Sequence, residues 1–324
     1  MNLEERINIA LSTMEKKGHH ISSTKKIKSR DNINANIIRL NESKKSYALK
    51  LYKEPSAEDP RKRCKAEKDF YNYMESLKVD SIAKPIEFDC NHHWSIISWI
   101  DGEKKHKLSK TEIENIANFI ATINKLENKE MAKGLDFASE ACRSAESVSK
   151  AIRKRLKQLR EAKADNKLKE EIKTWANDII TNSYIKAERE FIEKRSIKSH
   201  WKSKDIGKYV SPSDIGLHNM LFVEGKIYFI DFEYSGRDDI SKLIADLVLQ
   251  PNYCFSRVEE EIVLKSLEQN LDCKDRGWIE RYYDIKEIIR IKWCLIMLNG
   301  FMANNITIER FQRIKEYLHR GEGK

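Results

Sequence analysis

Three polar residues able to do chemistry stand near the two ends of one short segment, SPSDIGLHNMLFVEGKIYFIDFEYSGRDD, residues 211–239. Asp214 and Asn219 lie at or before the start of the apolar run NMLFV, and Asp231 follows the apolar run KIYFI. The Glu-Gly pair between the runs is typical of a two-residue hairpin loop, in which glycine supplies a positive φ. Such a hairpin pairs Asn219 with the residue before Asp231. We therefore expect the three polar side chains to converge at its open end.

Two interpretations of this convergence are open. Aspartate and asparagine at a hairpin mouth commonly do no more than cap turns. The spacing Asp-x-x-x-x-Asn followed by a strand-borne Asp-Phe is also the arrangement that kinase-like phosphotransferases use. In the second interpretation Asp214 is the catalytic base that orients the attacking hydroxyl, while Asn219 and Asp231 hold Mg²⁺ against the nucleotide phosphates.

Upstream elements supply the partners that such a site needs. The alternating segments 34–41 and 46–53 predict two strands joined by a polar turn, and 61–77 has helical spacing. Lys50 lies in the second strand, where a phosphate-binding lysine is expected, and Glu67 lies on the helix as its ion-pair partner. Each residue type is common in this chain, so their order along these elements is the informative feature.

Composition indicates a soluble, helix-rich protein of the α+β class. The chain has 324 residues, 35% of them charged and 40% hydrophobic, with 11 Gly and 5 Pro, and this length favours two lobes. We expect a small β-rich lobe over residues 1–100 and a large helical lobe over residues 101–324. The apolar runs are too short for a membrane span and the start does not resemble a signal peptide, so a cytoplasmic location is expected.

The six cysteines are widely scattered, without a Cys-x-x-Cys pair. This spacing argues against a structural zinc site and against a disulfide framework. We expect reduced thiols, most of them packed in the interior.

The block from SPSD-x-G-x-HN to DFEYSGRDD resembles the aminoglycoside phosphotransferase and choline kinase family, which has a bilobal, protein-kinase-like fold. The resemblance runs from about residue 25 to residue 255. It implies ATP and Mg²⁺ as cofactors and a hinge within SIISWIDG, residues 95–102. By the same resemblance, backbone groups of Ser98, Trp99 and Ile100 bind adenine.

Two positions depart from the family pattern. Pro212 stands where the family has a histidine that braces the catalytic loop, which leaves proton transfer possible but changes the support of Asp214. The loop expected over the phosphates, KSRDNINANIIRL, has no glycine. Close approach to phosphate must then rely on small or polar residues such as Asn34.

These features together predict an ATP-dependent kinase that phosphorylates a hydroxyl group of a small molecule. A pseudokinase that keeps the fold without turnover is an alternative, and retention of all five key residues argues against it. A nucleic-acid-binding protein is another, suggested by a pI of about 9.1. The basic run within 152–173 is, however, typical of the solvated face of a helix.

Charge also bears on the acceptor. The chain has 61 Lys and Arg against 51 Asp and Glu, and a basic approach repels polycations. We expect a neutral or anionic acceptor, such as a sugar or sugar-like compound, and poor activity on aminoglycosides. The alternative is that the excess basic residues lie on solvated helix faces away from the cleft and that local acids such as Glu233, Asp238 and Asp239 form a small cation pocket. A choline or ethanolamine type of amino-alcohol kinase is the second candidate. The identity of the acceptor, the choice of ATP over GTP and the oligomeric state are not determined by the sequence.

Overall fold

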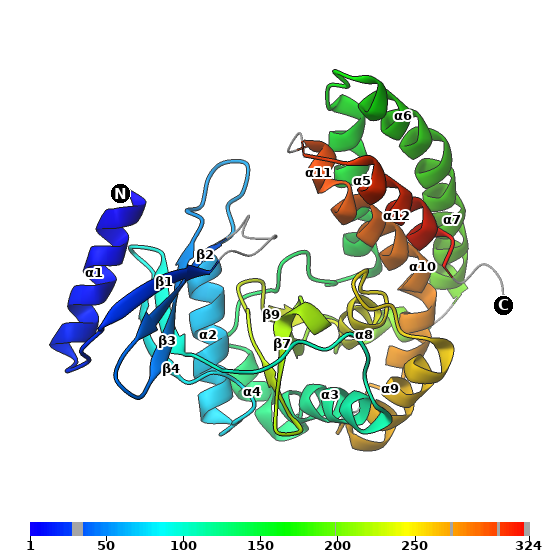
Figure 1. Ribbon diagram of the computed structural model, residues 1–324. Helices are drawn as coiled ribbons and strands as arrows, with labels where there is room; N and C mark the ends of the chain where they lie inside the picture. Colours follow the sequence, from blue (N-terminus) through cyan, green and yellow to red (C-terminus); the bar gives the residue numbers. More distant parts are fainter. Residues whose placement is uncertain (28–34, 198, 273–274, 303–304, 321–324) are drawn as a thin grey trace. The chain divides into compact units, whose positions relative to one another are not determined.

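The computed structural model describes residues 1–27, 35–197, 199–272, 275–302 and 305–320. The chain forms two compact units (Figure 1). The first unit comprises Met1–Ile116, Glu130–Ser139 and Pro212–Gly236, and the second comprises Ala117–Lys129, Glu140–Ser211 and Arg237–Lys324. The predicted α+β class is confirmed, with the five-stranded sheet in the first unit and a predominantly helical second unit. The lobe boundary at residue 100 stays a prediction.

A five-stranded antiparallel sheet with the order β1-β2-β3-β5-β4 forms the frame of the first unit. Its strands are β1 (Ser23–Ile27), β2 (Ala35–Asn41), β3 (Ser46–Tyr52), β4 (Pro85–Asp89) and β5 (Trp94–Ser98). The two strands predicted over 34–41 and 46–53 are confirmed as β2 and β3. Strand β1 and the N-terminal helix α1 (Leu3–Lys16) were not predicted from the sequence.

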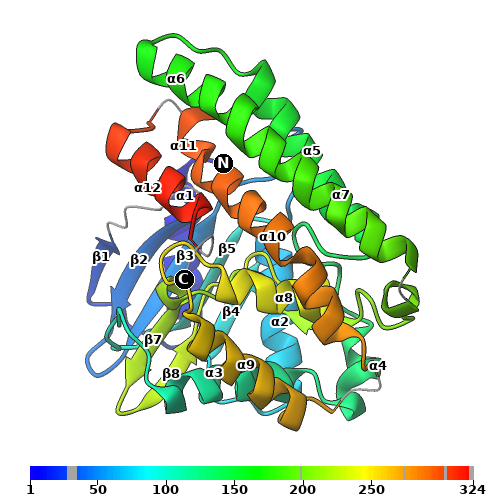
Figure 2. The same cartoon turned by 90° about the vertical axis from the view of Figure 1, so that its right-hand side faces the viewer.

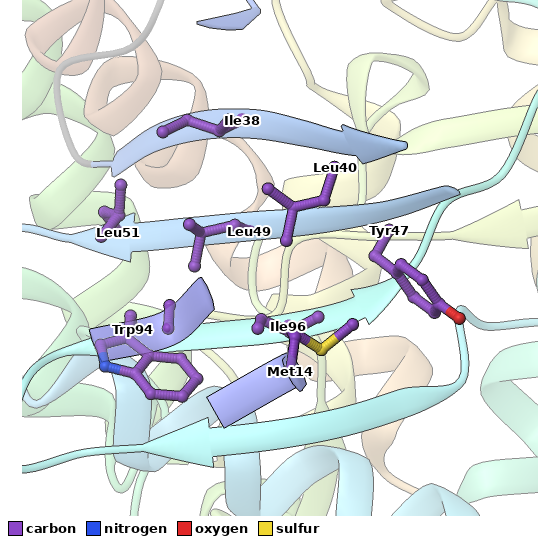
Figure 3. Packing of buried hydrophobic residues seen from close by; sticks show 9 residues of the cluster. Met14, Ile38, Leu40, Tyr47, Leu49, Leu51, Trp94 and Ile96 are labelled. Atoms are coloured by element: carbon purple, nitrogen blue, oxygen red, sulfur yellow. The ribbon is translucent and has the colours of Figure 1, made fainter. Parts of the chain in front are cut away.

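One face of this sheet packs against α1 (Figure 3). Because side chains alternate across a strand, every second residue of the central strands faces the helix. The resulting core contains residues of α1, β2, β3 and β5: Ala10, Met14, Ile38, Leu40, Tyr47, Leu49, Leu51, Trp94 and Ile96. The same alternation turns Lys50, between Leu49 and Leu51, to the opposite face.

Helix α2 (Arg63–Ser76) confirms the helix predicted over 61–77 and follows β3 in the chain. It buries Glu67, Phe70, Tyr71 and Met74, which have the i, i+3, i+4, i+7 spacing of one helix face. This buried face carries a carboxylate among its apolar side chains, and that carboxylate meets Lys50.

The predicted hairpin is β7 (Met220–Val223) paired with β8 (Lys226–Phe229). Glu224 and Gly225 have φ values of 48° and 81°, which is the two-residue turn expected when both central residues have positive φ. The hairpin is fixed within the first unit, because Phe222 exchanges two backbone hydrogen bonds of 3.0 Å with Glu103 and the Phe229 amide donates to the Ser81 carbonyl.

The second unit is built mostly of helices around α10 (Trp278–Met297) (Figure 2). The others are α5 (Ala145–Glu161), α6 (Lys167–Trp175), α7 (Thr181–Ile197), α8 (Ile240–Val248), α9 (Arg257–Asn270), α11 (Asn299–Met302) and α12 (Ile308–Leu318). A short sheet pairs β6 (Tyr209–Ser211) with β9 (Gly236–Asp238), and α3 (Lys110–Ile123) and α4 (Lys129–Ala132) cross from one unit to the other.

The basic run on α5 is a solvated helix face, as predicted. Ile152, Leu156 and Leu159 are buried at helical spacing, while Arg153 and Lys154 between them are exposed. Among the described residues, no helix has the length and hydropathy that a membrane crossing requires. A cytoplasmic location stays a prediction.

Candidate active site

Lys50 and Glu67 form the ion pair expected from their positions. The Lys50 Nζ donates to Glu67 Oε2 across 2.6 Å, and both residues are buried. The Tyr52 hydroxyl donates to the same carboxylate oxygen at 2.9 Å and lies 2.7 Å from the Ser95 hydroxyl. Strand β3 therefore supplies both the cation and a hydroxyl that hold Glu67 of α2 in one orientation.

Two further carboxylates meet the same lysine. Lys50 Nζ lies 2.5 Å from Asp231 Oδ1 and 3.3 Å from Glu233 Oε2. Oxygens of Glu67, Asp231 and Glu233 lie within 4.8 Å of one another. A lysine from β3, a glutamate from α2 and the acids that follow β8 thus form one polar cluster inside the first unit.

Burial and charge compete within this cluster. Burial alone would lower the pKa of Lys50, but the charges of Asp231, Glu67 and Glu233 outweigh it and raise that pKa well above its usual value. Burial raises the pKa of Glu67 and of Glu233, and the nearby Lys50 opposes the rise only in part. Lys50 is therefore a permanent cation held among more carboxylates than it can neutralise.

Packing couples Asp231 to α2. Phe232 stacks against Phe70 with ring centroids 4.4 Å apart and meets Tyr71 edge to face at 5.4 Å. The backbone of Asp231 has a φ of 66°, in the left-handed region that L-residues rarely adopt. This turn sends the Asp231 side chain to Lys50 while Phe232 stays in the core.

Arg63, in the first turn of α2, completes the cluster. Its side chain is fully buried, 2.6 Å from Asp59 and 3.5 Å from Glu233, and its guanidinium lies 5.6 Å from the ring centre of Tyr234. In the described part of the chain, its Nε and Nη1 find no hydrogen-bond partner. Arg63 thus adds positive charge beside the acids that surround Lys50.

Asp214 lies in the loop before the hairpin. Ser213 has a φ of 68°, and the Asp214 amide donates to the Pro212 carbonyl at 2.9 Å. One carboxylate oxygen, Oδ2, lies 3.2 Å from His218 Nε2, whereas Oδ1 has no hydrogen-bond partner among the described residues. Pro212 offers no side-chain hydrogen bond to this loop, and the histidine that contacts Asp214 is His218, four residues after the aspartate.

The protonation of His218 follows from this contact. Burial alone would lower the pKa of His218, but the hydrogen bond and charge of Asp214, together with the charge of Asp231, raise it above the usual value. The His218 carbonyl also accepts a hydrogen bond from Lys104. A positively polarised ring therefore lies beside one oxygen of Asp214.

Asn219 is held by a side-chain hydrogen bond and by backbone hydrogen bonds. Its Nδ2 donates to the Asp214 carbonyl at 3.0 Å, and its own carbonyl accepts from the Ile230 amide at 3.0 Å. The predicted pairing of Asn219 with Ile230 is thereby confirmed. Among the described residues the side-chain oxygen Oδ1 of Asn219 makes no hydrogen bond, so it is available to a ligand.

The donor set fits Mg²⁺. Carboxylate and amide oxygens are the ligands that this hard cation prefers, and Asp231 and Asn219 provide them at the open end of the hairpin. Glu67 Oε1 is buried without a hydrogen-bond partner in the described part of the structure. This unpartnered oxygen belongs to a residue of the same cluster as Asp231, and it is an observation in favour of a cation because buried carboxylate oxygens are normally satisfied.

Two of the three hinge amides are already used inside the sheet. The Ser98 amide donates to the Lys84 carbonyl and the Trp99 amide to the Ser46 carbonyl, at 2.8 and 2.9 Å. Ile100 has no such backbone bond within the described residues. The adenine role of Ser98, Trp99 and Ile100 stays a prediction, in which carbonyls and the Ile100 amide are the available groups. Asn34 lies outside the described residues.

Arg63 and His218 lie in the candidate site and were not predicted, whereas Glu233 was expected only as one acid of a small cation pocket. Asp238 and Asp239, the other acids of that expected pocket, are buried in ion pairs with Lys242 and Arg281. Glu233 had a local signal, because it stands two residues after Asp231 in the short polar segment that follows β8. His218 had a weaker one, four residues after Asp214. Arg63 had none, since a basic residue at the start of a helix is usually solvated.

Comparison with known proteins was made by sequence and by structure. Residues 26–269 match the phosphotransferase enzyme family (APH). A sequence search among curated proteins finds no match.

Solved structures match over nearly the whole chain. Spectinomycin phosphotransferase APH(9)-Ia, in complex with ADP and spectinomycin, has a TM-score of 0.63 at 14% identity and covers 97% of this chain and 94% of its own. Choline kinase LicA from Streptococcus pneumoniae has a TM-score of 0.63 at 18% identity, with 97% and 98% covered. ADP-bound aminoglycoside phosphotransferase APH(2'')-Ib has a TM-score of 0.58 at 16% identity, and the match covers 95% of this chain and 96% of its own. The predicted protein-kinase-like fold is thereby confirmed.

Proposed function

The chain belongs to the phosphotransferase enzyme family and acts on a hydroxyl acceptor, and from that premise we propose that it is an ATP-dependent, Mg²⁺-requiring kinase of a small metabolite. The observation that carries the proposal is the simultaneous contact of buried Lys50 with Glu67 and Asp231. Strand β3, helix α2 and the end of hairpin β7–β8 meet at this lysine, as a phosphate-binding site requires.

Asp214 is the base in this proposal. Its Oδ1 is buried and lacks a hydrogen-bond partner among the described residues, so the hydroxyl of an acceptor would satisfy it. His218 keeps the other oxygen occupied at 3.2 Å and so directs the proton to Oδ1. The positive φ of Ser213 shapes the backbone that presents the carboxylate.

Lys50 supplies charge to the nucleotide. Its ammonium, held by Glu67, would exchange its contact with Asp231 for the α- and β-phosphates. Asp231 and Asn219 would then hold Mg²⁺, which neutralises developing charge on the phosphates. Phe232, packed on α2, keeps Asp231 in register with Lys50.

For the acceptor we favour a neutral or anionic hydroxyl compound, such as a sugar or sugar-like molecule. The support is the excess of 61 basic over 51 acidic residues, which disfavours polycations. An amino-alcohol acceptor is the second candidate. It is supported by the residues DFEY at 231–234 and by the likeness to a choline kinase.

Substitution of the acids tests the mechanism. Asp214→Asn removes the base and leaves the metal ligands, so kcat should fall by about 10³-fold, within the usual range for a general base, while binding of Mg²⁺ with an ATP analogue persists. Asp231→Asn should lower kcat and also weaken binding of Mg²⁺ with the ATP analogue. Asp80→Asn, at an acid whose side chain is 85% exposed, is the matched control. A kcat of Asp214→Asn close to that of the wild type would contradict the assignment of Asp214 as the base.

A screen of ATP consumption tests the acceptor. Neutral sugars, sugar acids, phosphorylated sugars, choline, ethanolamine and kanamycin are compared by kcat/KM under the same conditions. The highest value with a neutral or anionic compound supports the proposal. A higher value with choline or ethanolamine selects the second candidate, and one with kanamycin contradicts the charge argument.

A further inference from the structure

Two cysteines that are far apart in the sequence lie side by side in the first unit. Cys64, in the first turn of α2, and Cys90, directly after β4, have their sulfur atoms 2.9 Å apart. Cys64 is buried and also lies 3.5 Å from the Trp94 carbonyl. Cys90 is partly exposed. The described cysteines are free thiols, as predicted, but their scatter along the sequence did not indicate that two of them meet.

The distance is close to that of a covalent bond. A disulfide bond is about 2.05 Å long, so the two sulfur atoms need to approach by only about 1 Å. No large rearrangement of α2 or of the β4–β5 turn is required. The pair is consequently placed for intramolecular oxidation, in contrast to Cys254, a partly exposed thiol of the second unit.

The surroundings give the two thiols different reactivity. The hydrogen bond from Cys64 lowers the pKa of the Cys90 thiol; burial opposes this change, and the charge of Lys68 adds to it. The hydrogen bond with Cys90, together with burial, raises the pKa of Cys64 far above its usual value. Exposure and thiolate character thus coincide at Cys90, which is where nucleophilic attack begins.

We propose that Cys64 and Cys90 form a dithiol site that hydroperoxides oxidise to an intramolecular disulfide. The Cys90 thiolate attacks one oxygen of the peroxide and the O–O bond breaks, which gives Cys90 sulfenic acid and releases hydroxide from hydrogen peroxide or an alkoxide from an organic hydroperoxide. The Cys64 sulfur then attacks the sulfenic sulfur, the S–S bond forms as the S–O bond breaks, and the Cys64 proton leaves with the sulfenic hydroxyl as water. Both sulfur atoms are oxidised, and the peroxide is reduced by two electrons.

The disulfide would join elements that position Lys50. Glu67 lies three residues after Cys64, about one turn along α2. The β4–β5 turn that carries Cys90 is already tied to α1, because the Arg6 side chain donates to the His92 and His93 carbonyls. Oxidation would therefore fasten α2 to this turn in the arrangement in which Glu67 meets Lys50.

Mass spectrometry of the full chain tests the site. Reduced protein is treated with hydrogen peroxide, the remaining thiols are alkylated, and a digest is examined without reduction. We expect a peptide pair joined through Cys64 and Cys90, lighter by two hydrogen atoms and separated by dithiothreitol. It should form at least about tenfold faster than oxidation of Cys254, a partly exposed thiol of the second unit.

Variants and thermal unfolding provide the controls. Cys90→Ser should abolish the joined peptides and leave Cys64 unmodified, while Cys254→Ser should leave their rate unchanged. Oxidation should raise the unfolding temperature of the wild-type protein and not that of Cys90→Ser. Failure to detect the joined peptides in the wild-type protein, formation no faster than Cys254 oxidation, or Cys90 sulfinic acid as the main product would each overturn the proposal. None of these readouts depends on kinase activity.

Discussion

Replacement of Lys50 by methionine tests the balance of charge in the candidate active site. Methionine fills a similar volume but carries no charge, so Glu67 and Glu233 remain buried without their shared cation. The exposed fractions of their side chains are 1% and 3%, against 41% for Asp231. The two glutamates therefore carry most of the expected cost.

The magnitude follows from the distances. With an effective dielectric constant of about 20, attraction to Lys50 is about 6 kcal/mol for Glu67 at 2.6 Å and about 5 kcal/mol for Glu233 at 3.3 Å. Desolvation of the buried ammonium offsets much of this attraction. Removing one partner from a buried pair typically costs about 3–5 kcal/mol, and we expect Lys50→Met to lower the free energy of unfolding by that amount.

Glu67→Gln is the informative partner variant. Because three carboxylates surround Lys50, with Arg63 beside one of them, loss of one negative charge leaves the lysine paired with Asp231 and Glu233. We expect a stability change below about 1 kcal/mol, and a cost for the double variant about 2 kcal/mol smaller than the sum of the single costs. Loss of the charge-assisted bond that positions Lys50 should reduce kcat/KM for ATP by about 10- to 100-fold.

The assay is equilibrium denaturation of the wild type, both single variants and the double variant, followed by two spectroscopic probes because a chain of two units need not unfold in one step. Steady-state kinetics in ATP supply the second readout. A Lys50→Met cost below about 1 kcal/mol, or additive costs in the cycle, would refute the reasoning.

Two further predictions concern support of the site. Burial alone would raise the pKa of Asp59, but Arg61 and Arg63 outweigh it and hold that pKa well below its usual range. Ionised Asp59 therefore stabilises the folded state above the unfolded pKa of about 3.9, and this contribution to the free energy of unfolding is lost as pH falls. Asp59→Asn should therefore lower the free energy of unfolding, measured by urea titration, by about 3 kcal/mol at pH 7. Below about pH 4 the difference in free energy of unfolding between wild type and variant should shrink by about 1.4 kcal/mol per pH unit. A difference that does not depend on pH would contradict this. Gly236→Ala places a Cβ 2.5 Å from a backbone oxygen, whereas the Cβ of Gly225→Ala meets nothing within 4 Å. Thermal unfolding should therefore show a free energy of unfolding lowered by about 1 kcal/mol in Gly225→Ala and by several times more in Gly236→Ala. Equal losses would show that the close approach at Gly236 is relaxed by the backbone.

Local features of the site were readable from the sequence because they depend on neighbours in the chain. The Glu-Gly turn fixed the register of hairpin β7–β8, and that register paired Asn219 with Ile230. Alternation along β3 and the helical spacing of α2 placed Lys50 and Glu67 on suitable elements. The resemblance around DFEYSG supplied the roles expected of these residues.

The first strand and helix were missed for different reasons. Strand β1 has four exposed residues followed by one half-buried residue and lacks an apolar alternation. Helix α1 did carry a local signal that was not used, because Asn2 and Glu5 form a capping box and Ile7, Ala10 and Met14 have helical spacing. Their stability comes from packing against the sheet, which is a tertiary contribution that overrides local propensity.

By itself, the sequence determined the order of the elements and the identity of the acids, amide and lysine that a phosphotransferase requires, because strand alternation, helix periodicity and turn chemistry act over a few residues. Only the tertiary structure decided which distant side chains share a site. Glu233 lies beside Lys50 of β3 and Arg63 of α2, and Cys64 contacts Cys90 across 26 positions of sequence. Such contacts depend on how α2 packs against the sheet and against Phe232, and no periodicity along a single element specifies that packing.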